Sequence, residues 1–293
     1  MPETSPLIGV PDLAASIGDV VVIDASWVYP PFNSAGIDVR QHYCERHIPG
    51  SWFLDLASLS RATRLLDPRV PALMRPPRTL LQGLVAGAVP SRDSPIVVTD
   101  MDGGCTSAPF ARWLLRDAGY ANVRLLDGGT PSWWLGHGLA LTDREPRLLA
   151  LDAAPSAVAP SVADASPWFA TFEDIRSTIE GRLAGQLLDC RALTSNNGVL
   201  PDDYGAVEIP CAGIVRSTEV VEETDHGQRF QRPADLKALF AARFVDHDRP
   251  KITTCYFGVG AAVVATALEI ACYAPTRVYA GSIIEYAHRV GAG

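Results

Sequence analysis

A cysteine at the end of a strand-like run carries the strongest chemical signal in this sequence. Cys255 follows residues 251–254, which have the pattern of a buried strand, and it precedes a glycine-bearing loop and a predicted helix over 261–273. Such a turn directs loop N–H groups and a helix N-terminus at the sulfur, and both favour the thiolate. We therefore expect Cys255 to be an accessible nucleophile with a lowered pKa. The loop comprises Tyr256, Phe257, Gly258, Val259 and Gly260.

A structural role is the alternative for the same residues. A cysteine taken at random is more often a buried packing residue than a nucleophile, so it is the position of Cys255 between strand and helix that favours chemistry. Tyr256 and Phe257 make the loop aromatic, which suits a bulky or weakly charged substrate or a docking partner protein. Equally, the two rings could close a pocket by packing.

The elements that must position this cysteine follow an alternating order. Apolar runs over 20–23, 96–99 and 123–126 predict buried strands. The second run stops at Asp100, and a glycine turn then leads into an apolar helical segment over 108–115. Strands that alternate with helices predict an α/β fold, with a parallel sheet covered by helices on both sides.

The second half of the chain repeats the order of the first. The motif Leu187-Leu188-Asp189 corresponds to Val22-Ile23-Asp24, and the strand that ends at Cys255 corresponds to the one that ends at Asp100. Motifs that recur in the same order, at a nearly constant distance along the chain, indicate that the two halves arose by duplication of one domain.

The length of the chain agrees with two copies of one fold. At 293 residues, the chain is long enough for two domains that each bury a core. We expect an N-terminal domain over 1–141 and a C-terminal domain over 168–293. The segment 142–167 is rich in Ala, Pro and Ser, as a linker is.

Charge and cysteine usage exclude several partners. The formal net charge is −8 and no run of Lys or Arg is long enough to follow a phosphate backbone, so we expect neither nucleic acid nor a membrane as a partner. The N-terminus lacks the basic start and apolar stretch of a signal peptide, which predicts a cytoplasmic protein. The six cysteines form no CxxC and no His pair has metal-ligand spacing, so we expect free thiols and no metal.

Seven motifs in fixed order carry a family resemblance. With them, the chain resembles the tandem-domain sulfurtransferases, the family of rhodanese and 3-mercaptopyruvate sulfurtransferase, over nearly its whole length. The motifs are VIDASW (22–27), HIPGSWFLD (47–55) and LLDGGTPSWW (125–134), followed by LLDCR (187–191), EIPCA (208–212), TTCYFGVGA (253–261) and YAGSIIEY (279–286).

The resemblance implies two rhodanese-like α/β domains, of which the first is inactive and the second catalytic. Asp100 and Cys255 match that asymmetry. It further implies that Cys255 takes sulfur from a small donor, becomes a persulfide and passes the sulfur to a thiol or other thiophilic acceptor, with the N–H groups of residues 256–260 holding the anion. No cofactor is implied. A protein sulfur carrier is a further partner to be expected.

The chain also departs from the family pattern. Its loop lacks the basic residues that thiosulfate-specific members carry, and Phe257 and Gly260 stand where mercaptopyruvate-specific members have a polar loop with a hydroxyl. The arginines that bind the substrate carboxylate in those members are replaced by the segment 203–205. Arg191 and Arg216 are the candidate substitutes, although Arg191 could equally be an ion-pair partner. Asp55 matches a family position that faces the active site, and N-capping is its alternative role.

Three other functions compete with sulfur transfer. The sequence after Gly258 imitates part of a GxGxxG nucleotide-binding motif, but its third glycine is absent. A phosphatase with a Cys-x5-Arg loop needs an arginine where this chain has Ala261. The third alternative is a persulfide carrier that does not turn over, or a catalytically degenerate binding module.

Overall fold

The architecture comes from a computed structural model of the whole chain, which describes residues 5–28, 35–66, 75–151, 165–192 and 207–291. The chain forms two compact units, here called unit 1 and unit 2. Unit 1 contains Met1–Leu59, Arg78–Ala154 and Val221–Phe230, and unit 2 contains Ser60–Pro77, Pro155–Val220 and Gln231–Gly293.

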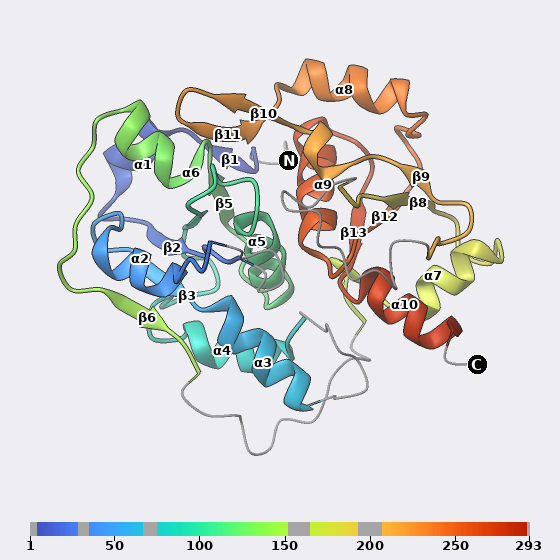
Figure 1. Cartoon of the computed structure of the whole chain (residues 1–293), viewed down its shortest axis with the longest axis horizontal. Helices are drawn as coiled ribbons and strands as arrows, with labels where there is room; N and C mark the ends of the chain where they lie inside the picture. The colour runs from blue at the N-terminus through green and yellow to red at the C-terminus, as the bar shows by residue number, and fades with distance from the viewer. Residues whose placement is uncertain (1–4, 29–34, 67–74, 152–164, 193–206, 292–293) are drawn as a thin grey trace. The chain divides into compact units, whose positions relative to one another are not determined.

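Unit 1 is built on a sheet of six parallel strands in the order β1-β5-β4-β2-β3-β6 (Figure 1). The strands at its centre are apolar and buried, which explains why they form continuous hydrophobic runs in the sequence. The predicted strands over 96–99 and 123–126 are found at those bounds. The strands are β1 (Leu7–Ile8), β2 (Val21–Asp24), β3 (Trp52–Leu54), β4 (Ile96–Thr99), β5 (Val123–Leu126) and β6 (Arg147–Leu149).

Helices flank this sheet. The helix α5, predicted over 108–115, extends to Asp117 and packs against β4 and β5. The Asp38 side chain caps α2 by accepting a hydrogen bond from the N–H of Gln41 at 3.0 Å. The helical segments of unit 1 are α1 (Val10–Ser16), α2 (Val39–Glu45), α4 (Arg78–Val85), α5 (Ala108–Asp117), α6 (Gly129–Pro131) and the π-helical turn Ser132–Gly136. The helix α3 (Leu56–Leu66) begins in unit 1 and ends in the segment that belongs to unit 2.

A β-hairpin from the second half of the chain also belongs to unit 1. It consists of the antiparallel strands β10 (Val221–Thr224) and β11 (Gly227–Phe230). Figure 1 shows it beside β1 and α6. Gly103 allows the close approach, because a Cβ at that position would stand 1.8 Å from the carbonyl oxygen of Gln228.

Unit 2 has a sheet of five parallel strands in the order β7-β13-β12-β8-β9. The helix α9 packs against β12 and β13, while α7 packs against β8. The predicted fold class, α/β with two domains that each have a parallel sheet flanked by helices, is therefore confirmed. The elements are β7 (Phe169–Ala170), α7 (Phe172–Ile179), β8 (Gln186–Asp189), β9 (Gly213–Ile214), a 3-10 turn (Ser217–Glu219), α8 (Pro233–Ala242), β12 (Lys251–Thr254), α9 (Val259–Ile270), β13 (Thr276–Tyr279) and α10 (Ser282–Gly291).

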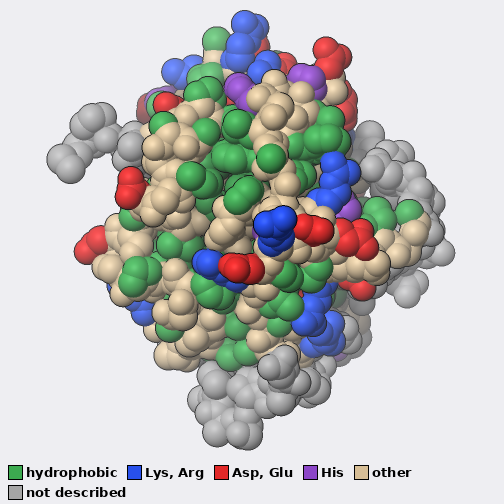
Figure 2. Space-filling view, turned by 90° about the vertical axis from the view of Figure 1, so that its left-hand side faces the viewer, with side chains coloured by type: hydrophobic (Ala, Val, Ile, Leu, Met, Phe, Trp, Pro, Cys, Tyr) green, Lys and Arg blue, Asp and Glu red, His purple; other side chains and the backbone are tan. Residues whose placement is uncertain are grey.

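The linker predicted over 142–167 remains a prediction. Its first part contains β6, which pairs with β3, and residues 152–164 lie outside the described part of the chain. In the described residues, no helix is both long and apolar enough to cross a membrane. The face drawn in Figure 2 shows acidic and basic side chains interspersed among hydrophobic and uncharged ones, without a broad patch of either sign.

Candidate functional site

Cys255 lies in unit 2 at the end of β12, where the chain turns into α9. The thiol accepts a hydrogen bond from the backbone N–H of Gly258, with 3.1 Å between nitrogen and sulfur. Gly258 has a φ of +100° and is the N-cap of α9, so the loop bends back over the sulfur before the helix begins. The N–H groups of Phe257 and Ala261 also contribute hydrogen bonds that favour the thiolate. The predicted convergence of loop amides on Cys255 is thus present.

The predicted lowering of the Cys255 pKa is wrong, and so is the predicted accessibility of this thiol. Only 4% of Cys255 is exposed. Burial raises the pKa of the thiol because it removes water from around the charged form, and the surrounding N–H groups oppose this rise without overcoming it. The sequence shows the N–H donors of the loop, but the extent of burial depends on the tertiary fold.

Ser282, in the motif over 279–286, also belongs to this site. Its hydroxyl oxygen accepts a hydrogen bond from the N–H of Cys255 at 3.0 Å and lies 4.0 Å from the sulfur. The hydroxyl also donates to the carbonyl of Tyr279 at 2.7 Å. The signal was available, because the carboxyl ends of β12 and β13 meet at the same edge of a parallel sheet and Ser282 follows β13.

The aromatic residues of the loop have different environments. Phe257 and Val259 are buried, whereas Tyr256 is half-buried. The guanidinium carbon of Arg191 stands 5.7 Å from the centre of the Tyr256 ring. Burial raises the pKa of the Tyr256 phenol, which therefore stays protonated at neutral pH. Tyr256 can act as a hydrogen-bond donor at the edge of this site.

Arg191 is held by an ion pair within its own segment. Its Nε and Nη2 donate to Oδ2 of Asp189 at 2.9 and 2.6 Å. Its backbone N–H donates to Oδ1 of the same carboxylate at 3.1 Å. The ion-pair alternative considered for Arg191 agrees with these contacts, and a contact with substrate remains a prediction.

Arg216 lies beside Arg191 in unit 2. Its Nη1 donates to the backbone carbonyl of Arg191 at 3.2 Å, and its backbone N–H donates to the carboxylate of Glu219 at 2.8 Å. These bonds place the guanidinium next to the backbone of Arg191, and its charge also acts on the Tyr256 phenol. The segment 203–205, where the sequence departs from the carboxylate-binding pattern of the family, lies outside the described residues.

In unit 1, Asp100 occupies the position at the end of β4 that corresponds to Cys255. Its Oδ1 accepts hydrogen bonds from the N–H groups of Asp102 and Gly104, and its Oδ2 accepts three more from residues 106–108, over distances of 2.7–3.2 Å. The Asp100 carboxylate therefore accepts hydrogen bonds from the N–H groups of this loop. These five N–H groups are already hydrogen-bonded to a side chain of the protein.

Two further carboxyl groups lie close to Asp100. Burial raises the pKa of Asp24 to about 6, with a smaller contribution from the charge of Asp100. Burial and the charge of Asp100 also raise the pKa of Asp102 to about 6. Cys105, in the same loop, is buried, and burial raises its pKa as well. These groups make the loop of unit 1 an acidic site that disfavours a thiolate.

Asp55 belongs to unit 1 and acts at the start of α3. Its Oδ1 accepts a hydrogen bond from the N–H of Ser58 at 2.8 Å, which is the geometry of an N-cap. The alternative role of N-capping therefore agrees with its contacts, and a role toward substrate remains a prediction. His47 is buried, and its Nδ1 lies 2.9 Å from the carbonyl oxygen of Tyr43, a hydrogen bond within its own segment.

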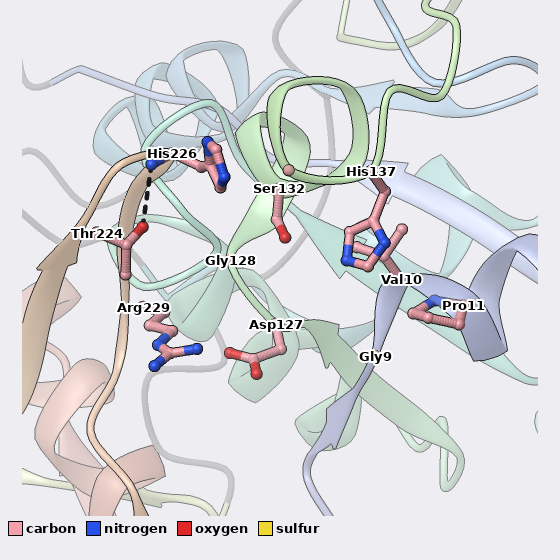
Figure 3. A pocket seen from close by; sticks show the side chains of 11 residues that line it. Gly9, Val10, Pro11, Asp127, Gly128, Ser132, His137, Thr224, His226 and Arg229 are labelled. Atoms are coloured by element: carbon pink, nitrogen blue, oxygen red, sulfur yellow. Dashed lines mark hydrogen bonds between the residues drawn. The ribbon is translucent and has the colours of Figure 1, made fainter.

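A separate polar pocket of about 280 Å³ lies within unit 1, partly beneath the β10–β11 hairpin (Figure 3). Asp127 and Arg229 point toward one another on one side of it, and His137 and His226 lie on the other. Burial raises the pKa of Asp127, while the charge of Arg229 opposes the rise. No cysteine lines this pocket. Within the described ranges, no group of three or more His, Cys, Asp or Glu side chains could hold a metal ion.

Known proteins with similar sequences are sulfurtransferases. The model of the rhodanese-like domain matches residues 20–135. The 3-mercaptopyruvate sulfurtransferase of Rattus norvegicus is 31% identical over 270 residues, which cover 90% of this chain and 84% of that protein. The thiosulfate sulfurtransferase of Bos taurus is 30% identical over 275 residues, which cover 92% of this chain and 85% of that protein.

A solved structure extends this similarity to the fold. The crystal structure of SseA from Escherichia coli, described with the rhodanese fold and the mechanism of 3-mercaptopyruvate sulfotransferases, is 27% identical in sequence. It matches with a TM-score of 0.72 over 95% of this chain and 99% of that chain. The resemblance expected from the sequence motifs is confirmed: the chain belongs to the family of sulfur-transferring enzymes that includes rhodanese and 3-mercaptopyruvate sulfurtransferase.

Proposed function

We propose that this protein transfers a sulfane sulfur from a small donor to a thiophilic acceptor through a persulfide on Cys255. The observation that supports this most directly is the hydrogen bond from the N–H of Gly258 to Cys255 Sγ, at the N-terminus of α9. Membership of the sulfurtransferase family supports the reaction class. In this proposal, catalysis belongs to the domain over 168–293 and not to the domain over 1–141.

The reaction has two half-reactions that need only a thiol. First, the Cys255 thiolate attacks the outer sulfur of the donor, a sulfur–sulfur bond forms, and the rest of the donor leaves with the electron pair of the bond that breaks. Then the acceptor attacks the outer sulfur of the persulfide, and the thiolate of Cys255 leaves. Neither step requires a metal or an organic cofactor.

The loop contributes by holding negative charge. The N–H groups near Cys255 and the N-terminus of α9 stabilise both the attacking thiolate and the persulfide anion, because each carries its charge on sulfur. Because burial raises the pKa of Cys255, the resting site holds mainly the thiol at neutral pH. We therefore expect sulfur loading to become faster as the pH rises, since the thiolate fraction grows.

The donor is thiosulfate, 3-mercaptopyruvate or a low-molecular-weight persulfide. The loop over 256–260 contains no basic residue, so it offers no charge of its own to an anionic donor. Arg191 is already paired with Asp189. Arg216 is therefore the residue that we propose to attract an anionic donor, and Asp55 is a further proposed substrate contact. The acceptor is a small thiol or a protein sulfur carrier.

A persulfide carrier that does not turn over is the second candidate. The low exposure of Cys255 and its raised pKa favour it, because a buried thiol is slow to exchange with small molecules. Such a carrier would accept one sulfur and release it to a specific partner alone. Counting the sulfide released per protein separates the two functions.

The test is multiple-turnover sulfur transfer with each of the three donors and dithiothreitol as the acceptor. We expect at least one donor to give many sulfides per protein beyond the release measured without protein, and Cys255→Ser to add none to that background. Cys272→Ser is the matched control, since Cys272 is an exposed cysteine of the same unit, and it should keep the activity. Release of no more than one sulfide per protein with every donor would favour the carrier, and activity that survives in Cys255→Ser would contradict the proposed mechanism.

A further inference from the structure

Unit 2 holds a second buried cysteine beside Cys255. The parallel strands β8 and β12 pair Asp189 with Thr254, so Cys190 and Cys255 are the next residues along the two strands. The hydrogen-bonded pairing of β8 and β12 continues at this point, because the N–H of Cys190 donates to the carbonyl of Thr254 at 2.7 Å. Neighbouring strands lie about 4.8 Å apart, and disulfides join Cα atoms about 4.4–6.8 Å apart. The backbone therefore places these two cysteines within reach of one another.

The environment of Cys190 also places its thiol near that of Cys255. Cys190 is completely buried, and its Sγ lies 3.5 Å from the carbonyl oxygen of Leu188. Burial raises its pKa, and the negative charge of Cys255 is the next cause of the rise. The N–H donors to Cys255 come from the loop that follows it, whereas Cys190 approaches from the neighbouring strand.

The fold does not require a cysteine at this place. In unit 1, Asp24 pairs with Thr99 as Asp189 pairs with Thr254, and the next residue is Ala25. The N–H of Ala25 donates to the carbonyl of Thr99 at 2.9 Å, which is the counterpart of the bond made by Cys190. The same backbone geometry therefore forms around an alanine. A thiol at position 190 adds chemistry that the strand itself does not need.

We propose that Cys190 is a second thiol of the site, which attacks Cys255 Sγ in the persulfide and releases the outer sulfur as sulfide. This inference rests on the proposed function, because it requires a persulfide on Cys255. A bond forms between the two Sγ atoms while the bond between Cys255 Sγ and the outer sulfur breaks. Cys190 is oxidised to the disulfide, the outer sulfur is reduced, and the proton of the Cys190 thiol leaves on HS⁻.

This reaction releases sulfide without an external thiol. The product is an intramolecular disulfide, which cannot accept another sulfur until a thiol reductant opens it. In the absence of an acceptor, the loaded enzyme therefore discharges once and then stops. An acceptor that reacts with the persulfide before Cys190 does removes the outer sulfur and returns Cys255 to its free thiolate, so that the enzyme can accept sulfur again.

The test follows the intact mass of the donor-loaded protein after the donor and all thiols have been removed. We expect the wild-type protein to pass from a gain of about 32 Da to a loss of about 2 Da as sulfide appears, and peptide mapping to find a disulfide between Cys190 and Cys255. Cys190→Ala introduces the residue that unit 1 carries, and it should hold the gained sulfur at least tenfold longer. Cys105→Ala, which removes a buried cysteine of unit 1, should discharge like the wild-type protein.

Two results would overturn the inference. One is a wild-type protein that holds its sulfur as long as Cys190→Ala does, and the other is a disulfide that maps to a different pair of cysteines. A separate measurement is independent of sulfur loading: brief oxidation of the reduced protein with diamide should join Cys190 to Cys255. A wild-type protein that gains no sulfur from any donor contradicts the proposed function. In that case, the diamide product still shows whether Cys190 and Cys255 lie close enough to form a disulfide.

Discussion

Asp100 and Cys255 occupy equivalent places in their units, one at the end of β4 and the other at the end of β12, and each accepts hydrogen bonds from the loop that follows its strand. The side chain at this position determines which group accepts the hydrogen bonds of the loop N–H groups. In unit 1 they donate hydrogen bonds to the Asp100 side chain, and in unit 2 they surround the Cys255 thiol. The same backbone arrangement therefore surrounds a carboxylate in one unit and a thiol in the other.

We predict that Asp100→Asn destabilises unit 1. The carboxylate accepts five backbone N–H groups, and either orientation of an amide would turn its NH₂ toward at least two of them. Unpaired buried donors cost about 1–3 kcal/mol each, while relief of repulsion with Asp24 and Asp102 offsets part of the loss. We expect the free energy of unfolding in urea to fall by about 2 kcal/mol. A stability equal to that of the wild-type protein would show that the hydrogen bonds contribute little.

The raised pKa of Asp24 predicts a dependence of stability on pH. The folded carboxyl keeps its proton up to a pH of about 6, whereas the unperturbed group releases it near 3.8. The folded state therefore binds more protons between these values, and the stability that this group supports at pH 4 is lost as the pH rises through 6. The loss is at most about 3 kcal/mol.

Asp24→Asn should remove this contribution, because the amide carries no charge and its oxygen can still accept the N–H of Ser26. We expect the variant to be more stable than the wild-type protein at pH 7 and nearly equal to it at pH 4, as measured by urea unfolding at both pH values. Asp19→Asn, a change at an exposed aspartate, is the control. A stability difference that is the same at pH 4 and pH 7 would contradict the assignment.

Gly103→Ala should loosen the β10–β11 hairpin from unit 1. A Cβ at Gly103 would collide with the backbone of Gln228, and its φ of +94° adds strain. Gly138→Ala is a matched control, because Gly138 also has a positive φ but has nothing within 4 Å of its Cβ position. We expect both variants to lose about 1 kcal/mol from backbone strain. Only Gly103→Ala should show faster hydrogen exchange over 221–230, and equal exchange in the two variants would contradict the contact.

Part of this fold could be predicted from the sequence, because strand ends and glycine turns are local features. The strand that ends before Asp100 has its predicted bounds, and α9 begins two residues before the predicted start because Gly258 acts as its N-cap. Burial and contacts between distant segments were not predictable in this way. The raised pKa of Cys255 and the return of the hairpin to unit 1 both depend on them.

Arg216→Ala should weaken the binding of anionic donors. If the Arg216 guanidinium attracts the donor, its loss should raise KM by about tenfold and leave kcat within about twofold, since a charge that binds substrate and transition state equally affects KM alone. Arg176→Ala is the control, because it removes an exposed positive charge of unit 2 that pairs with Glu173. Steady-state kinetics with thiosulfate and 3-mercaptopyruvate make the measurement. An unchanged KM for both donors would remove Arg216 from the site.

The central claim is that Cys255 becomes a persulfide, and the intact mass of the protein directly after exposure to each donor tests it most directly. The wild-type protein should gain one sulfur atom, about 32 Da, from at least one of thiosulfate, 3-mercaptopyruvate and a low-molecular-weight persulfide. Cys255→Ser should gain none, and peptide mapping should place the added sulfur on Cys255. A wild-type protein that gains no sulfur from any donor, or a serine variant that gains as much as the wild-type protein, would contradict the account.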